Sequence, residues 1–138
     1  MSTDRGPGNG PRLGLRVSHR RYVPYSHAHY AGNLVDGAYS LQLFGDVATE
    51  LVVTTDGDEG LFASYDDVQF RAPVRAGDIL EVTVELVAAG SRSRRLEFNA
   101  WVVGRGVPDE SASAARMLDE PVLATTATGT VVVPSRTD

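Results

Sequence analysis

The sequence predicts an α+β domain in which a curved antiparallel sheet of about five strands wraps one long, buried helix. Two observations carry this prediction. One segment in the first half of the chain has apolar residues at the three- and four-residue spacing of a helix, and nearly everything after it alternates as strands do. At 138 residues, the chain has the length of one domain.

The helix is expected to begin at Asp36 and to run for about 18 residues. Its apolar residues recur on one side, and Leu43 and Val47 make a second side apolar as well. The residues of the first side are Ala38, Leu41, Phe44, Ala48, Leu51 and Val52. A helix that is apolar on more than one side is buried rather than lying on a surface. The turn-rich segment DGDEG at 56–60 ends it.

The strands flank this helix on both sides. A first strand is expected at 13–23, followed by a loop at 24–35, and later strands are expected at 61–70, 79–87, 94–103 and 122–133. Residues 104–121 are expected to form a loop with a short helical turn, and tails at 1–12 and 135–138 flank the domain of residues 13–134. A sheet that curls round such a helix is the hot-dog architecture, and its open edge predicts that two copies pair through their sheets.

Composition excludes several classes of chemistry. The chain has no cysteine, which rules out disulfides, thiolate metal sites and a cysteine nucleophile. All 13 basic residues are arginine, so a Schiff-base lysine and a P-loop lysine are absent too. The net charge of −5, without an arginine-dense face interleaved with aromatics, argues against nucleic acid. No apolar run approaches the roughly 20 residues that span a membrane, and no signal peptide is visible, so a cytoplasmic protein is expected.

Three stretches resemble a known family. They are HYAGNLVDGAYSLQLFGDVATEL at 29–51, DGDEGLFASYDDVQFRAPVRAGD at 56–78 and SRSRRLEFNAWV at 91–102. They resemble the 3-aminobutyryl-CoA and β-alanyl-CoA ammonia lyases of the hot-dog thioesterase superfamily. The resemblance implies a cofactor-free enzyme that adds ammonia to, or removes it from, the β-carbon of a short acyl thioester on CoA or acyl carrier protein. It also implies a homodimer or an assembly of dimers.

Such chemistry needs a group that exchanges a proton, donors for the thioester oxygen, and a dry slot. The unpaired N–H groups at the helix start, around Asp36 and Gly37, are the candidate oxyanion site, although Asp36 is also a plain N-cap residue. His29 is the candidate general acid and base, because its ordinary pKa suits proton transfer near neutrality. His27 is expected to contact substrate or to support His29. With only His19 as a further histidine, no metal site is predicted.

Other polar residues near the helix have two interpretations each. Asn33 either positions a thioester oxygen or caps a turn, and Tyr30 either lines the acyl slot or packs. Asp46 and Glu50 are spaced i, i+4 on the helix. They either face a partner protomer's site, binding the ammonium or activating water, or they pair with an arginine such as Arg71 or reach solvent.

The arginines suggest how substrates are held. Arg20, Arg21 or Arg71 is a candidate for the carboxylate of a bulkier amine such as glycine. The segment SRSRR at 91–95 either meets the phosphates of the carrier or is a solvated hairpin tip. Motifs of serine hydrolases and nucleotide-binding enzymes are absent. The sequence therefore predicts amine addition to an unsaturated acyl thioester, with a thioesterase, alone or following the addition, or a non-catalytic acyl-binding module as the alternatives.

Overall fold

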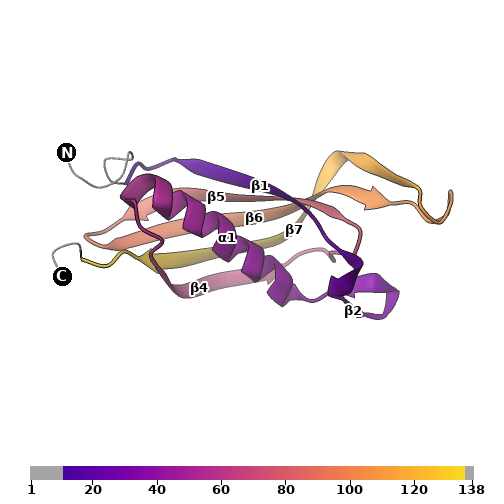
Figure 1. Ribbon diagram of the computed structural model, residues 1–138, viewed down its shortest axis with the longest axis horizontal. Helices are drawn as coiled ribbons and strands as arrows, with labels where there is room; N and C mark the ends of the chain where they lie inside the picture. Colours follow the sequence, from indigo (N-terminus) through magenta and orange to yellow (C-terminus); the bar gives the residue numbers. More distant parts are fainter. Residues whose placement is uncertain (1–10, 136–138) are drawn as a thin grey trace.

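The computed structural model describes residues 11–135, and one long helix lies across a twisted antiparallel sheet (Figure 1). The five-stranded sheet has the order β1-β5-β6-β7-β4, with β1 and β4 at its edges. The elements are β1 (Arg16–Tyr22), β2 (Ala28–Tyr30), β3 (Leu34–Val35), α1 (Gly37–Asp56), β4 (Leu61–Phe70), β5 (Ile79–Ala89), β6 (Ser93–Gly106) and β7 (Ala115–Val132). The predicted helix wrapped by a five-stranded sheet is confirmed. The tails predicted at 1–12 and 135–138 lie outside the described residues, except for residues 11, 12 and 135.

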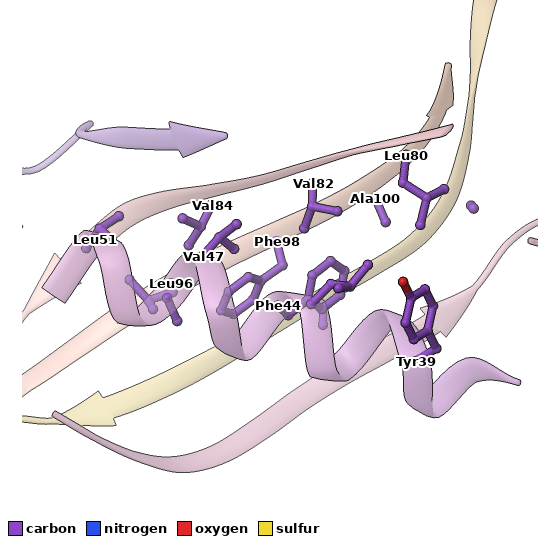
Figure 2. Packing of buried hydrophobic residues seen from close by; sticks show 14 of the residues in the cluster. Tyr39, Phe44, Val47, Leu51, Leu80, Val82, Val84, Leu96, Phe98 and Ala100 are labelled. Carbon is purple, nitrogen blue, oxygen red and sulfur yellow. The ribbon is translucent and has the colours of Figure 1, made fainter. Parts of the chain in front are cut away.

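The core fills the space between α1 and the concave face of the sheet (Figure 2). Phe44 of α1 stacks on Phe98 of β6, with ring centroids 4.9 Å apart. Alternate residues of the central strands point at the helix, because successive side chains of a strand face opposite ways. The buried residues of β5 and the facing part of β6 are Leu80, Val82, Val84, Leu86, Leu96, Phe98, Ala100 and Val102. Burying each of the larger side chains contributes about 1.5–3 kcal/mol, so this contact fixes where the helix lies.

Two expected loops contain strands. Residues 24–35 include the small antiparallel hairpin β2–β3, in which Ala28 pairs with Val35. The short helical turn predicted within 104–121 is wrong. There β6 and β7 continue as a paired arm, with Arg105 opposite Arg116, and Figure 1 shows this arm extending beyond the end of the main sheet. Backbone pairing across the arm, including Val107 N–H to Ala114 O at 2.8 Å, outweighs the local helix preference of its alanines.

The helix ends at Asp56, the first residue of the DGDEG segment that was predicted to end it, and Gly57 follows in the left-handed region with φ of 64°. Gly57 donates its N–H to the Val53 carbonyl at 2.9 Å, which closes the last turn. No helix in the described part of the chain is both long enough and apolar enough to cross a membrane.

Arg94 anchors the end of α1 to β6 through a buried ion pair. Its Nε and Nη2 donate to the two carboxylate oxygens of Asp56 at 2.9 and 2.8 Å, and the side chains are 1% and 0% exposed. Arg94 Nη1 also donates to the carbonyls of Gly90 and Ser93, which satisfies the remaining guanidinium face. For Arg94, both interpretations of the SRSRR segment, as a solvated tip and as an anion-binding site, are therefore wrong.

The variant Arg94→Met is expected to lower the free energy of unfolding by about 3 kcal/mol or more, because the buried Asp56 carboxylate loses its counter-charge. The double variant Asp56→Leu/Arg94→Met should recover part of this loss, since no buried charge is left unpaired. Arg92→Ala, which removes an exposed arginine two residues away, is the control and should cost at most about 0.5 kcal/mol. Urea unfolding measures all three, and a loss in Arg94→Met no larger than that of the control would contradict the prediction.

Candidate active site

In residues 11–135, the first turn of α1 has backbone donors without a partner. Asp36 occupies the N-cap position with extended backbone, but its side chain makes no capping hydrogen bond. Its carbonyl accepts the N–H of Tyr39 at 3.3 Å. Within the described residues, the N–H groups of Gly37 and Ala38 have no acceptor. Two adjacent donors at the positive end of a helix can stabilise an oxyanion.

Gly37 is required by its neighbour on β4. A Cβ added at Gly37 would lie 2.3 Å from Cε1 of Phe70, so the aromatic ring lies directly against the first residue of the helix. Phe70 is itself 59% exposed, which is unusual for so large an apolar side chain. The ring therefore forms an apolar wall beside the two free N–H groups.

His27, directly before β2, and His29, within β2, lie on the segment that leads into α1. The His27 ring lies 4.2 Å, between centroids, from the ring of Tyr39 in the first turn of α1. The His29 ring instead lies 4.5 Å from Tyr30, edge to face, and both residues are exposed. The structure thus brings His27 rather than His29 into ring contact with the helix, while the acid–base role of His29 stays a prediction.

The two helix carboxylates face β1 of their own chain. Glu50 Oε1 lies 2.7 Å from His19 Nε2, and Asp46 Oδ2 forms an ion pair with Arg21 Nη2 at 3.9 Å. Both carboxylates are about half exposed. The expected alternative partner, Arg71, donates instead to Thr126 Oγ1 at 3.3 Å. Sequence reasoning missed His19 as a partner of Glu50, although the alternation of β1 places residues 19 and 21 on one face.

Two phenols lie near Asp46. Tyr65 of β4 donates its hydroxyl to the Leu41 carbonyl at 2.5 Å, and burial, with a smaller effect of Asp46, raises its pKa to about 12. Burial also raises the pKa of Tyr39, which the charge of Arg21 opposes and that of Asp46 reinforces. Both hydroxyls therefore stay protonated near neutral pH, and Tyr65 ties β4 to the N-terminal half of the helix.

Asn33 and Tyr30 take positions that the sequence left open. Asn33 has a left-handed backbone with φ of 62°, and its carbonyl accepts the N–H of Ala76 at 2.9 Å, so its backbone shapes the turn. Tyr30 is 58% exposed and does not pack in the core. In residues 11–135, no group of three His, Cys, Asp or Glu side chains is placed to hold a metal.

Comparison with known proteins agrees with this geometry. The thioesterase superfamily model matches residues 32–108, which include Asn33, all of α1 and Arg71. The 3-aminobutyryl-CoA ammonia lyase of Acetoanaerobium sticklandii is 52% identical over 107 residues, covering 78% of this chain and 85% of that protein. The chain belongs to the thioesterase superfamily. Within that superfamily, the resemblance to the ammonia lyases is confirmed.

Two further relatives are similar over most of the chain. The structure of β-alanyl-CoA:ammonia lyase from Clostridium propionicum superimposes with a TM-score of 0.83 at 39% identity, over 88% of this chain and 87% of that one. A 3-hydroxyacyl-[acyl-carrier-protein] dehydratase of a Caulobacter species is 31% identical, over 72% of this chain and 64% of that protein. The likeness to the lyase structure therefore spans nearly the whole domain.

In this superfamily member, Gly37→Ala is expected to destabilise the fold by about 1–3 kcal/mol, because the new methyl group overlaps the Phe70 ring. Gly45→Ala, in the middle of the same helix with no atom within 4 Å of the added Cβ, should instead stabilise by about 0.5–1 kcal/mol. Urea unfolding compares the two, and equal effects at both glycines would contradict the close contact with Phe70.

Proposed function

We propose that the chain adds ammonia or a small amine to the β-carbon of an α,β-unsaturated acyl thioester, and catalyses the reverse elimination, without a cofactor. The 52% identity to a 3-aminobutyryl-CoA ammonia lyase, over 85% of that protein, carries this proposal. The names of all three compared relatives describe acyl thioesters with a nitrogen or oxygen on the third carbon. Formation and cleavage of that carbon–heteroatom bond is the chemistry they have in common.

In the elimination direction, a base takes a proton from the α-carbon, and ammonia leaves the β-carbon with its bonding electron pair. The negative charge passes through the thioester oxygen, which the free N–H groups of Gly37 and Ala38 are placed to stabilise. His29 is the proposed acid and base, and His27 the proposed substrate contact beside Tyr39. The exposed Phe70 ring shields this end of the helix from water.

A second copy of the chain completes the proposed site. The edge strand β4 is exposed along nearly its whole length, and Leu61 and Phe70 are 68% and 59% exposed. An unpaired edge strand is a template for pairing with another strand. A homodimer joined through β4 would cover the Phe70 ring, and with it the mouth of α1. Asp46 and Glu50, half exposed on the helix, are the proposed groups that hold an ammonium or a water there.

The expected mass in solution is twice that of the 14.8 kDa chain, or a larger even multiple. Sedimentation velocity measures it. A species that stays monomeric at micromolar concentration would contradict pairing through β4.

The function is tested by the products formed from crotonyl-CoA alone, with ammonia, and with glycine, followed by mass spectrometry. We expect the intact thioester to gain the mass of the amine. For glycine, Arg71, directly after Phe70, is the proposed partner of the carboxylate. Free acid without any amine adduct would make the chain a thioesterase, and adduct followed by free acid would make it a bifunctional enzyme. No product at all would favour a non-catalytic module.

The residue roles are tested by His29→Ala, which should lower kcat about 10²–10⁴-fold with little change in Tm, because the ring is exposed. His27→Ala is the matched comparison and should have the smaller effect on kcat. A larger loss in His27→Ala than in His29→Ala would move the acid–base role to the imidazole that contacts Tyr39.

A further inference from the structure

A cavity lies between the β2–β3 hairpin and the β6–β7 arm. Its volume is about 1020 Å³, and its walls include the hairpin residues 31–34, the turn 75–78 and, from the arm, residues 105, 106, 108 and 112–115. Figure 1 shows the hairpin and the arm at the same end of the molecule as the start of α1. A single inorganic anion would fill little of this volume, so the cavity suits one end of a longer molecule.

Two of the charged lining residues neutralise each other. Asp78, 1% exposed, accepts Nε and Nη2 of Arg105 at 2.9 and 2.8 Å, and also the backbone N–H of Arg75 at 2.8 Å. The hydrogen bond to Asp78 raises the pKa of Arg105, so the guanidinium stays charged. Arg105 Nη2 also donates to the Pro73 carbonyl at 3.0 Å, so the Nε–Nη2 edge of the guanidinium is already occupied.

The cavity nevertheless presents unused donors. Tyr22, Tyr25, Asn33 and Arg75 are among its lining residues. Within residues 11–135, no hydrogen bond or ion pair engages any of the four side chains. The Tyr25 hydroxyl lies over Gly77, where an added Cβ would approach it to 2.8 Å, so this glycine makes room for the ring.

The charged residues that line the cavity favour the binding of an anion. Asp78 is the only acidic residue among the lining residues, and Arg105 neutralises it. Arg75 therefore contributes an uncompensated positive charge beside hydroxyl and amide donors. A guanidinium with neighbouring donors matches the geometry of a phosphate group.

We propose that this cavity binds the phosphate of the substrate's phosphopantetheine arm, with Arg75 as its cation. The inference rests on the proposed function, which makes an acyl thioester the substrate. One hairpin joins the two sites: His29 lies in its first strand, Asn33 lines the cavity, and α1 begins four residues after Asn33. CoA and acyl carrier protein both carry this phosphate, so the shared group is what Arg75 recognises. Binding of the carrier phosphate, which the sequence alone suggested for the segment 91–95, is thus proposed for Arg75 instead.

The test compares carriers with and without the phosphate. Arg75→Ala should raise KM about tenfold or more for crotonyl-4′-phosphopantetheine and crotonyl-CoA. It should leave KM within about twofold for crotonyl-pantetheine and the N-acetylcysteamine thioester, which lack phosphate. Arg75→Lys should raise KM for the phosphorylated thioesters less than Arg75→Ala does, because lysine keeps the positive charge but lacks the paired N–H donors of a guanidinium. Arg92→Ala is the matched control: it removes another exposed arginine, at the β5–β6 turn, and should change none of these values.

Direct binding separates this inference from the proposed function. Titration calorimetry of free CoA and free 4′-phosphopantetheine needs no turnover, and Arg75→Ala should weaken both about tenfold or more. Weakened binding with no amine addition by the wild type would support the site and contradict the function. Unchanged binding by Arg75→Ala, with full amine addition by the wild type, would support the function and contradict the phosphate site. Comparing CoA with a holo carrier protein then identifies the source of the phosphate.

Two results would overturn the assignment. One is an equal change in KM for phosphorylated and unphosphorylated thioesters, which would mean that Arg75 acts through the fold. The other is an effect confined to CoA and absent with 4′-phosphopantetheine, which would place the nucleotide phosphates, not the shared phosphate, in the cavity.

Discussion

The contact between α1 and the concave face of the sheet determines where everything else lies. Phe44 stacking on Phe98 stands at its centre, and buried residues continue to both ends of the helix. Because this packing fixes the helix, its first N–H groups open at one end of the sheet while Asp56 is held at the other by Arg94. The core packing therefore holds the free N–H groups at the helix start in place, without a capping side chain.

The polar side of the helix is organised by the edge strand β1. Asp46 and Glu50, one turn apart, face Arg21 and His19, two residues apart on the strand. The spacing matches because one helical turn rises about 5.4 Å and two strand residues about 6.6 Å. The same carboxylates proposed to act on an amine thus also hold the helix against β1, and Asp46 adds to the raised pKa values of two nearby phenols.

Much of the fold followed from local patterns, because the helix period and the strand alternation are properties of neighbouring residues. The arm at 104–118 was missed, since its strand character comes from pairing across the hairpin and not from its own alternation. The burial of Arg94 was missed for a similar reason: Asp56 is 38 residues away in sequence. The helix start and Gly37 were visible as a motif, whereas the contacts of His27, His19 and Phe70 depend on the tertiary fold.

The hairpin of β2 and β3 has a consequence for selectivity. It is short, and it is tied to the turn before β5 by Val35 N–H to Val74 O at 2.9 Å and by Ala76 N–H to Asn33 O at 2.9 Å. Its two flanks are thus held at a constant separation. If the thioester binds on one flank and the phosphate on the other, only substrates with a linker of matching length can occupy both sites. Selectivity for the acyl chain would then come from other residues.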